Sequence, residues 1–237
     1  MSTFPLPARL ASVRRWVLLP LLALDVLLIG QHAVLYVLHD LGRISSLPHW
    51  LDITQEGSVS EFLNWGKWLV ISLLLLALWA HTKMPTALGF AVAFAVIAAD
   101  DILMLHEGEG SALVGYLGLE GSLGLRAQDM GELLVYALLG TIVAGAVLLG
   151  LLAADAGGRR VGRVLLAFLG SLVFFAVGFD MLHALLANVR GLNFLLGMIE
   201  DGGEMIVGSL CLAFCAGLLA LVPRAELAAA HYPIAAE

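Results

Sequence analysis

The residues best suited to chemistry lie in the stretch DDILMLHE, which follows a long apolar run. It contains Asp100, Asp101, His106 and Glu107. In a continuous helix Asp100 and Glu107, which are seven residues apart, share one face to within roughly 20°. Carboxylate and imidazole groups in a helical bundle typically bind iron, zinc or manganese. The stretch therefore suggests half of a metal site.

Two later stretches supply similar groups. Asp180 and His183 have the i, i+3 spacing of the Glu-x-x-His pairs in di-metal carboxylate bundles. Glu200 and Glu204 are four residues apart, so they lie on the same face of a helix. These pairs predict that at least two further helices contribute ligands.

Several other residues have a plainer interpretation. Asp129 at a helix start favours the helix dipole and needs no ligand role, whereas for Glu132 the two interpretations are evenly balanced. Solvated loop acids are the expected role of Glu109 and Glu120. The two cysteines, one turn apart, are expected to pack against a neighbouring helix.

Composition places all these groups in a membrane protein. Of the 237 residues 61% are hydrophobic and only 13% are charged, with a mean hydropathy of +0.97. Soluble domains carry about 25% charged residues. The net charge of −7 also argues against nucleic acid as a partner.

Apolar runs of about 20 residues predict a polytopic, all-α transmembrane bundle of six spans. Ser58 and Glu61 have capping-box spacing before the second span, and Pro85 precedes the third. The first run is too long for the core of a signal peptide, so we expect it to be retained. The chain is expected to form a single integral membrane domain, residues 1–237, with spans at about 15–38, 61–81, 86–107, 130–153, 162–187 and 195–222.

Basic residues predict the orientation of the bundle. Three of them (Arg43, Arg126 and Arg190) fall on one side of a six-span arrangement. By the positive-inside rule both termini are expected in the cytoplasm, with the protein in a bacterial inner membrane. The opposite side carries eight basic residues: Arg9, Arg14, Arg15, Lys83, Arg159, Arg160, Arg163 and Arg224.

In this orientation nearly all ionisable residues of the spans gather in the outer half of the bundle. A charged group inside a bilayer costs at least about 2.5 kcal/mol, and Lys67 is the only lysine or arginine that lies away from the ends of a predicted span. A bound divalent metal would offset the excess of negative charge, as would protonated carboxyl pairs in a polar network. The candidate metal ligands are Asp100, Asp101, His106, Glu107, Glu132, Asp180, His183, Glu200 and Glu204.

The sequence resembles a group of bacterial multi-pass membrane proteins. Members carry Asp-Glu-x4-His-Glu at the end of the third span and Glu-Glu-x2-Glu in the last, where this chain has DDILMLHE and EDGGE. It departs from the pattern at Asp101 and Asp201, whose shorter side chains reach less far than glutamate. The resemblance implies a membrane bundle but no particular activity.

Two classes of function follow from these patterns. The first is a metal-binding membrane protein that acts on a lipid or a small periplasmic molecule. With iron it would be an oxidoreductase, and with zinc a hydrolase. Manganese and copper are further options for the metal. The alternative is a non-enzymatic subunit, a cation or proton transporter or a metal sensor. The inner half of the spans contains almost no ionisable residue except Asp25, which argues against transport.

Overall fold

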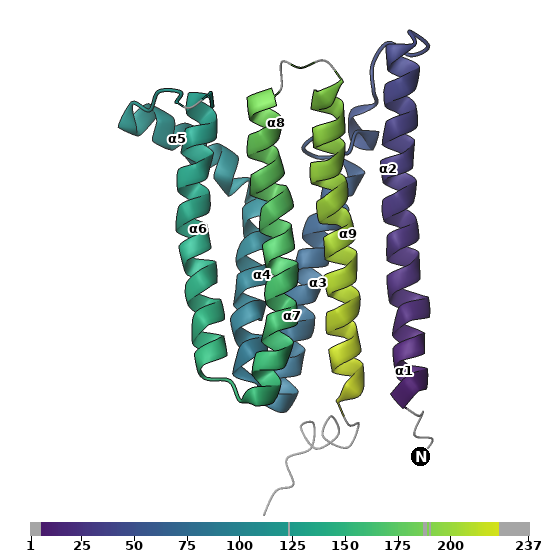
Figure 1. The fold of residues 1–237 in the computed structure, drawn as a ribbon, viewed down its shortest axis with the longest axis vertical. Coiled ribbons are helices and arrows are strands. Elements are labelled where there is room, and N and C mark those ends of the chain that lie inside the picture. The colour runs from purple at the N-terminus through teal and green to yellow at the C-terminus, as the bar shows by residue number, and fades with distance from the viewer. Residues whose placement is uncertain (1–5, 123, 187–188, 190, 223–237) are drawn as a thin grey trace, which may run out of the picture.

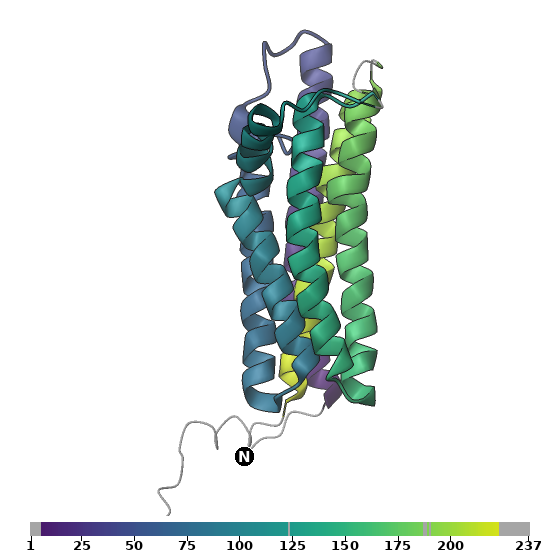
Figure 2. The same cartoon turned by 90° about the vertical axis from the view of Figure 1, so that its left-hand side faces the viewer.

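Helices running side by side build the described part of the molecule in the computed structural model (Figures 1 and 2). The structure describes residues 6–122, 124–186, 189 and 191–222. Within these ranges the chain forms no strand apart from a single bridge between Ser122 and Leu125. The predicted all-α class is confirmed.

The first half of the chain contains two long rods and a helix pair. Helix α1, a π-helical turn and α2 run on as one rod, and a 3₁₀ turn at His49–Leu51 interrupts the loop that follows. The bounds are α1 Leu6–Val13, π-helical turn Arg14–Leu18, α2 Leu19–Asp40, α3 Val59–Thr82, α4 Pro85–Leu103 and α5 Leu105–Leu117.

The second half adds three more rods. Helix α7, a second π-helical stretch and α8 again form one continuous rod. The bounds are α6 Ala127–Leu152, α7 Ala156–Val173, π-helical stretch Phe174–Phe179, α8 Asp180–Leu186 and α9 Leu192–Leu221.

These five rods and α4 are each long and apolar enough to cross a bilayer, which gives the six spans that were predicted. They are Ala8–Asp40, Val59–Thr82, Pro85–Leu103, Ala127–Leu152, Ala156–Leu186 and Leu192–Leu221. Large apolar side chains such as Leu138 and Leu149 are exposed on their outer faces, where a soluble protein would carry polar groups. The bundle therefore has the surface of a membrane protein.

Capping determines where several spans begin. Ser58 accepts a hydrogen bond from the Glu61 backbone N–H at the start of α3, as the predicted capping box requires. The Glu61 carboxylate, however, accepts from the Gly57 backbone N–H. Pro85 is the first residue of α4, which its fixed φ favours.

Three predicted span limits were wrong. The first span begins at Ala8 and not near residue 15, because α1 and the π-helical turn run on into α2. The third span ends at Leu103, because Met104 adopts a left-handed conformation (φ 50°, ψ 44°) and α5 starts afresh at Leu105. The fifth starts at Ala156 and not near residue 162, because the Asp155 carboxylate caps the helix by accepting from the Gly158 N–H. Gly158 also lies within this helix, close to Thr86 of α4.

Glycines allow α6 to lie against α4 and α5. A Cβ on Gly131 would meet the Gly110 carbonyl oxygen at 2.3 Å, and one on Gly89 would meet the Ala146 carbonyl oxygen at 2.5 Å. No side chain fits at either crossing. These contacts hold α4, α5 and α6 together as one wall of the bundle.

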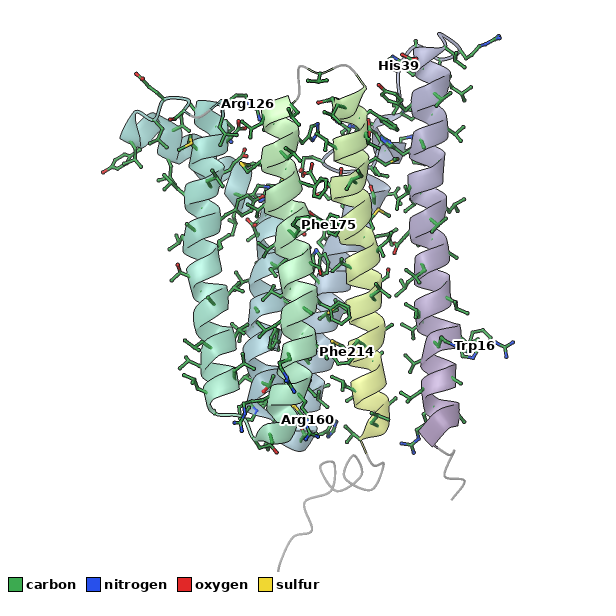
Figure 3. All side chains as sticks on the ribbon, in the orientation of Figure 1. Trp16, His39, Arg126, Arg160, Phe175 and Phe214 are labelled. Carbon is green, nitrogen blue, oxygen red and sulfur yellow. The ribbon has the colours of Figure 1, made fainter. Side chains whose placement is uncertain are left out.

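The described ends of the chain lie at the same end of the bundle. Arg9 of α1 donates a hydrogen bond to the Ala220 carbonyl at the end of α9. Figure 3 places Arg160 at this end, and Arg126 and His39 at the end that carries α5. Arg190 and Arg224, which entered the orientation argument, lie outside the described residues.

Candidate functional site

A cavity of about 650 Å³ opens within the α5 end of the bundle. Its walls come from α3 to α9 and from the loop before α3. All nine candidate ligands predicted from the sequence line it: Asp100, Asp101, His106, Glu107, Glu132, Asp180, His183, Glu200 and Glu204. The structure thus brings them to one place, whereas their binding of a metal remains a prediction.

Three further acids that the sequence argument left out of the site also line the cavity. Glu56 and Glu61 come from the loop before α3 and from its first turn, and Asp201 from α9. Glu56 lies just before the second span and Glu61 lies in its first turn. Both are therefore at the same level of the membrane as the other candidates, and this position could have identified them. In total ten carboxylates and two imidazoles line the cavity, and no lysine or arginine does so among the residues that the structure describes.

The break at Met104 determines how DDILMLHE contributes. In an uninterrupted helix Asp100 and His106 would point about 120° apart and could not touch. Instead, the Asp100 carboxylate accepts from the His106 backbone N–H at 3.0 Å, and its Oδ1 lies 3.2 Å from His106 Nδ1. The expected common helical face of Asp100 and Glu107 is therefore wrong, although both reach the cavity.

The pKa of His106 reflects this contact. Burial lowers the pKa of the imidazole, but the adjacent Asp100 carboxylate, with Glu107 and Asp101 nearby, raises it to about 9. The ring also stacks on Tyr136 of α6, with 5.0 Å between centroids. The Asp100 carboxylate and the Tyr136 ring therefore hold His106 in the wall of the cavity.

His183 pairs across helices and not with its neighbour Asp180. Its Nδ1 lies 3.1 Å from the Glu200 carboxylate of α9, and its Nε2 lies 2.8 Å from the Asn193 side-chain oxygen. Both ring nitrogens are thus engaged, and α8 is tied to α9. The predicted Asp-x-x-His unit acts here as two separate wall residues.

Asp129 and Glu132 have different roles, in agreement with the sequence analysis. Asp129 accepts from the Arg126 backbone N–H and pairs with its guanidinium, so it caps α6 and stays outside the cavity. Because of this pairing, the pKa of Arg126 is raised. Glu132 lines the cavity and accepts from the Gln128 side chain at 2.7 Å. Glu109 and Glu120 are exposed, as expected, but Glu109 lies in helix α5 and not in a loop.

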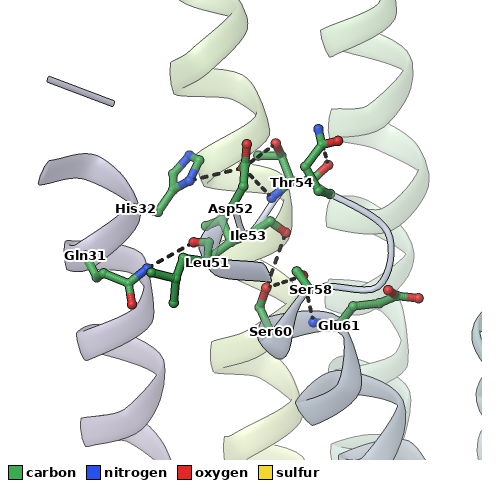
Figure 4. A network of polar contacts seen from close by, with 10 residues as sticks. Gln31, His32, Leu51, Asp52, Ile53, Thr54, Ser58, Ser60 and Glu61 are labelled. Atoms are coloured by element: carbon green, nitrogen blue, oxygen red, sulfur yellow. Dashed lines mark hydrogen bonds and ion pairs between the residues drawn. The ribbon is translucent and has the colours of Figure 1, made fainter. Parts of the chain in front are cut away.

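The loop before α3 is tied to α2 by polar contacts (Figure 4), and its residues Thr54 and Glu56 line the cavity. Asp52 lies 3.2 Å from His32 of α2 and accepts from the Thr54 hydroxyl, while Gln31 donates to the Leu51 carbonyl. These bonds hold the loop so that Glu56 faces Glu61 and Glu107. Partial burial and these two acids raise the pKa of Glu56 to about 7.

Trp68 is a fully buried donor in the wall of the cavity. Its side chain lines the cavity, and its indole N–H lies beside the Asp101 carboxylate. An indole can only donate, so this neighbour suits it.

The carboxylates are spread around the cavity. Among the described residues, no three His, Cys, Asp or Glu side chains are arranged so as to hold a metal ion. The pairs Asp100–His106 and His183–Glu200 occupy some of the candidate ligands. Any metal site would therefore need side chains to turn inward.

The fold and the cavity define a class: a six-helix membrane protein with an acidic chamber at one end. The chain belongs to the family described as Domain of unknown function (DUF8692), whose model matches residues 16–221. No curated protein matches the chain, and no solved structure does. The family therefore identifies the chain without assigning an activity.

Proposed function

We propose that this protein is an integral membrane metal-binding protein whose acidic cavity holds a divalent cation. The observation that carries the proposal is the lining of one cavity by ten carboxylates and two imidazoles without a lysine or arginine among the described residues. So many acids within one chamber repel one another, and a bound cation relieves this repulsion. Oxygen and imidazole donors suit iron, zinc and manganese.

The nearest buried cation does not serve this purpose. Lys67 donates to Asp25 at 2.7 Å and to the Met205 carbonyl at 2.9 Å, and it does not line the cavity. Its charge is already matched by Asp25, so the acids of the cavity have His106 and His183 as their basic neighbours. This leaves room for at least one divalent ion.

A site for chemistry fits this chamber better than a transport path. Toward the opposite end of the bundle, the interior is an apolar cluster around Phe90, Leu75 and Cys211. A path for ions needs polar groups through the whole membrane depth. Under this proposal a bound iron would support oxidation and a bound zinc hydrolysis, with both termini in the cytoplasm and the chamber facing the periplasm.

Metal content of the full-length protein tests the proposal. We expect purified protein in lipid nanodiscs to hold at least one iron, zinc or manganese ion per chain by elemental analysis. Chelation should lower the melting temperature by roughly 5–10 °C, the stabilisation expected for a ligand well above its Kd. The variant Glu107→Gln with Glu204→Gln removes two wall carboxylates and should lose the metal.

The matched control is Glu109→Gln with Glu120→Gln, which removes two exposed acids outside the cavity. It should keep both the metal and the response to chelation. Wild-type protein that neither contains nor binds any of these metals, and gains no thermal stability from them, would contradict the proposal. The carboxylates would then form a protonated polar network.

A further inference from the structure

The acidic chamber continues into an apolar crevice. On the side of the cavity away from α5, its walls carry hydrocarbon side chains and one glycine: Ile97, Leu139, Gly140, Val143, Leu172 and Val173. These residues come from α4, α6 and α7. The cavity therefore has a charged end and an apolar end.

The crevice lies where α6 and α7 are loosely joined. Helix α6 packs mainly on α4 and α5, whereas α7 packs on α9 and α4 and makes few contacts with α6. The two meet near the loop between them, where Gly162 lies against Leu151. Farther along, Val173 is 53% exposed, so this seam faces the surface that the bilayer would cover.

The length of the cavity matches one leaflet. Glu132 and Val143 on α6 are separated by about 16 Å along the helix, as are Asp180 and Leu169 on the α7–α8 rod. The hydrocarbon core of a bilayer is about 30 Å thick, so one leaflet is about 15 Å deep. A lipid chain lying parallel to the helices would fill this distance.

The charged end selects the head of such a molecule. Even with one divalent ion bound, acidic side chains outnumber basic ones in the lining, so an anionic phosphate is disfavoured and an amine is favoured. Buried Trp68 lines the same cavity, so its fluorescence can report binding there.

We propose that the cavity binds a membrane amphiphile with a protonated amine head and a hydrocarbon chain, which enters sideways between α6 and α7. The head lies among the carboxylates and the chain lies in the apolar crevice. This inference rests on the proposed function, because it names the class of substrate that would meet the metal site.

The test uses full-length protein in phosphatidylcholine nanodiscs, with Trp68 as the only tryptophan after Trp16, Trp50, Trp65 and Trp79 are replaced by Phe. Hexadecylamine brominated midway along its chain should quench Trp68 fluorescence saturably. Brominated hexadecanol, which lacks the amine, and butylamine, which lacks the chain, should bind at least tenfold more weakly. In protein with all five tryptophans, hexadecylamine should also raise the melting temperature, which keeps the test valid if the reporter variant is unstable.

Two glycine variants distinguish the crevice from the rest of α6. A Cβ at Gly140 or Gly145 meets nothing within 4 Å, so both positions have open space for the start of a side chain, but only Gly140 lines the cavity. Gly140→Leu should weaken hexadecylamine binding at least tenfold, whereas Gly145→Leu should leave it unchanged. Hexadecanol binding as tightly as hexadecylamine, or Gly140→Leu binding like wild type, would overturn the inference.

Metal content measured in the same samples separates the two proposals. Gly140→Leu should retain its metal, because it changes only the apolar end. Metal binding without amine binding would refute the amphiphile and leave the metal site standing. Saturable amine binding without any metal would refute the metal site and support the chamber as a site for an organic cation.

Discussion

The buried pair Lys67–Asp25 shows how single residues organise the interior. Asp25 is fully buried, accepts from Lys67, and also accepts from the Ser209 hydroxyl at 2.5 Å. The pair joins α2 to α3 and α9 at a point where α2 has few other buried residues. Charged groups in such a place are retained only when they are paired.

Removing one partner of this pair should be far more costly than removing both. Lys67→Met leaves the Asp25 carboxylate without its cation, and we expect a loss of about 3–5 kcal/mol of stability. Lys67→Met combined with Asp25→Leu should recover most of that loss. Thermal unfolding in detergent measures both, and a double variant as unstable as the single one would show that the pair is not the source of the effect.

At the scale of elements, the α4–α5 junction is the feature that shapes the site. Met104 adopts a left-handed conformation, which costs a residue other than glycine about 1–2 kcal/mol. The bond from the His106 N–H to Asp100 helps to hold the turn, and the turn carries His106 and Glu107 to the cavity. The strained backbone thus lies beside the candidate ligands.

Substitutions at Met104 should separate backbone strain from side-chain packing. Met104→Gly relieves the left-handed conformation and should maintain or raise the melting temperature. Met104→Ile is β-branched and should lower it by several degrees and reduce metal content, because His106 and Glu107 would shift. Thermal unfolding and elemental analysis measure the two effects.

Lys83 is the matched control for this junction, because it is also left-handed but ends α3 at the opposite end of the bundle. Lys83→Ile should lower the melting temperature without changing metal content. If Met104→Ile keeps its full metal content, the turn does not position the ligands.

For the whole molecule, the decisive property is which side of the membrane the chamber faces. The distribution of basic residues predicts that α5 and the chamber face the periplasm. Ser111 of α5 and Arg160 of α7 are both exposed and lie at opposite ends of the bundle (Figure 3 for Arg160). Cysteines at these positions would report the orientation, since Cys211 and Cys215 are buried.

We expect a membrane-impermeant maleimide to label Ser111→Cys in intact cells and Arg160→Cys only after the cells are permeabilised. The unmodified protein, which keeps Cys211 and Cys215, provides the background. The reverse labelling pattern would place the chamber on the cytoplasmic side, and its ligand would then be cytoplasmic or come from the inner leaflet.

The sequence by itself determined the six spans and the depth of each acidic residue. Hydropathy fixes which segments enter the bilayer, and the rise of 1.5 Å per residue fixes how deep Asp100 or Glu204 lies. For this reason the nine candidate residues could be predicted to gather at one level, and the structure places all nine around one cavity.

Only the tertiary structure decided which side chains meet. The pairs His106–Asp100, His183–Glu200 and Lys67–Asp25 depend on the turn at Met104 and on the rotation of each helix about its axis. The order of apolar and polar residues does not reveal the turn or the rotations. The same order is compatible with a continuous or a broken helix and with different neighbouring helices. The crevice between α6 and α7 was likewise unpredictable, since it arises from which helices α6 packs against.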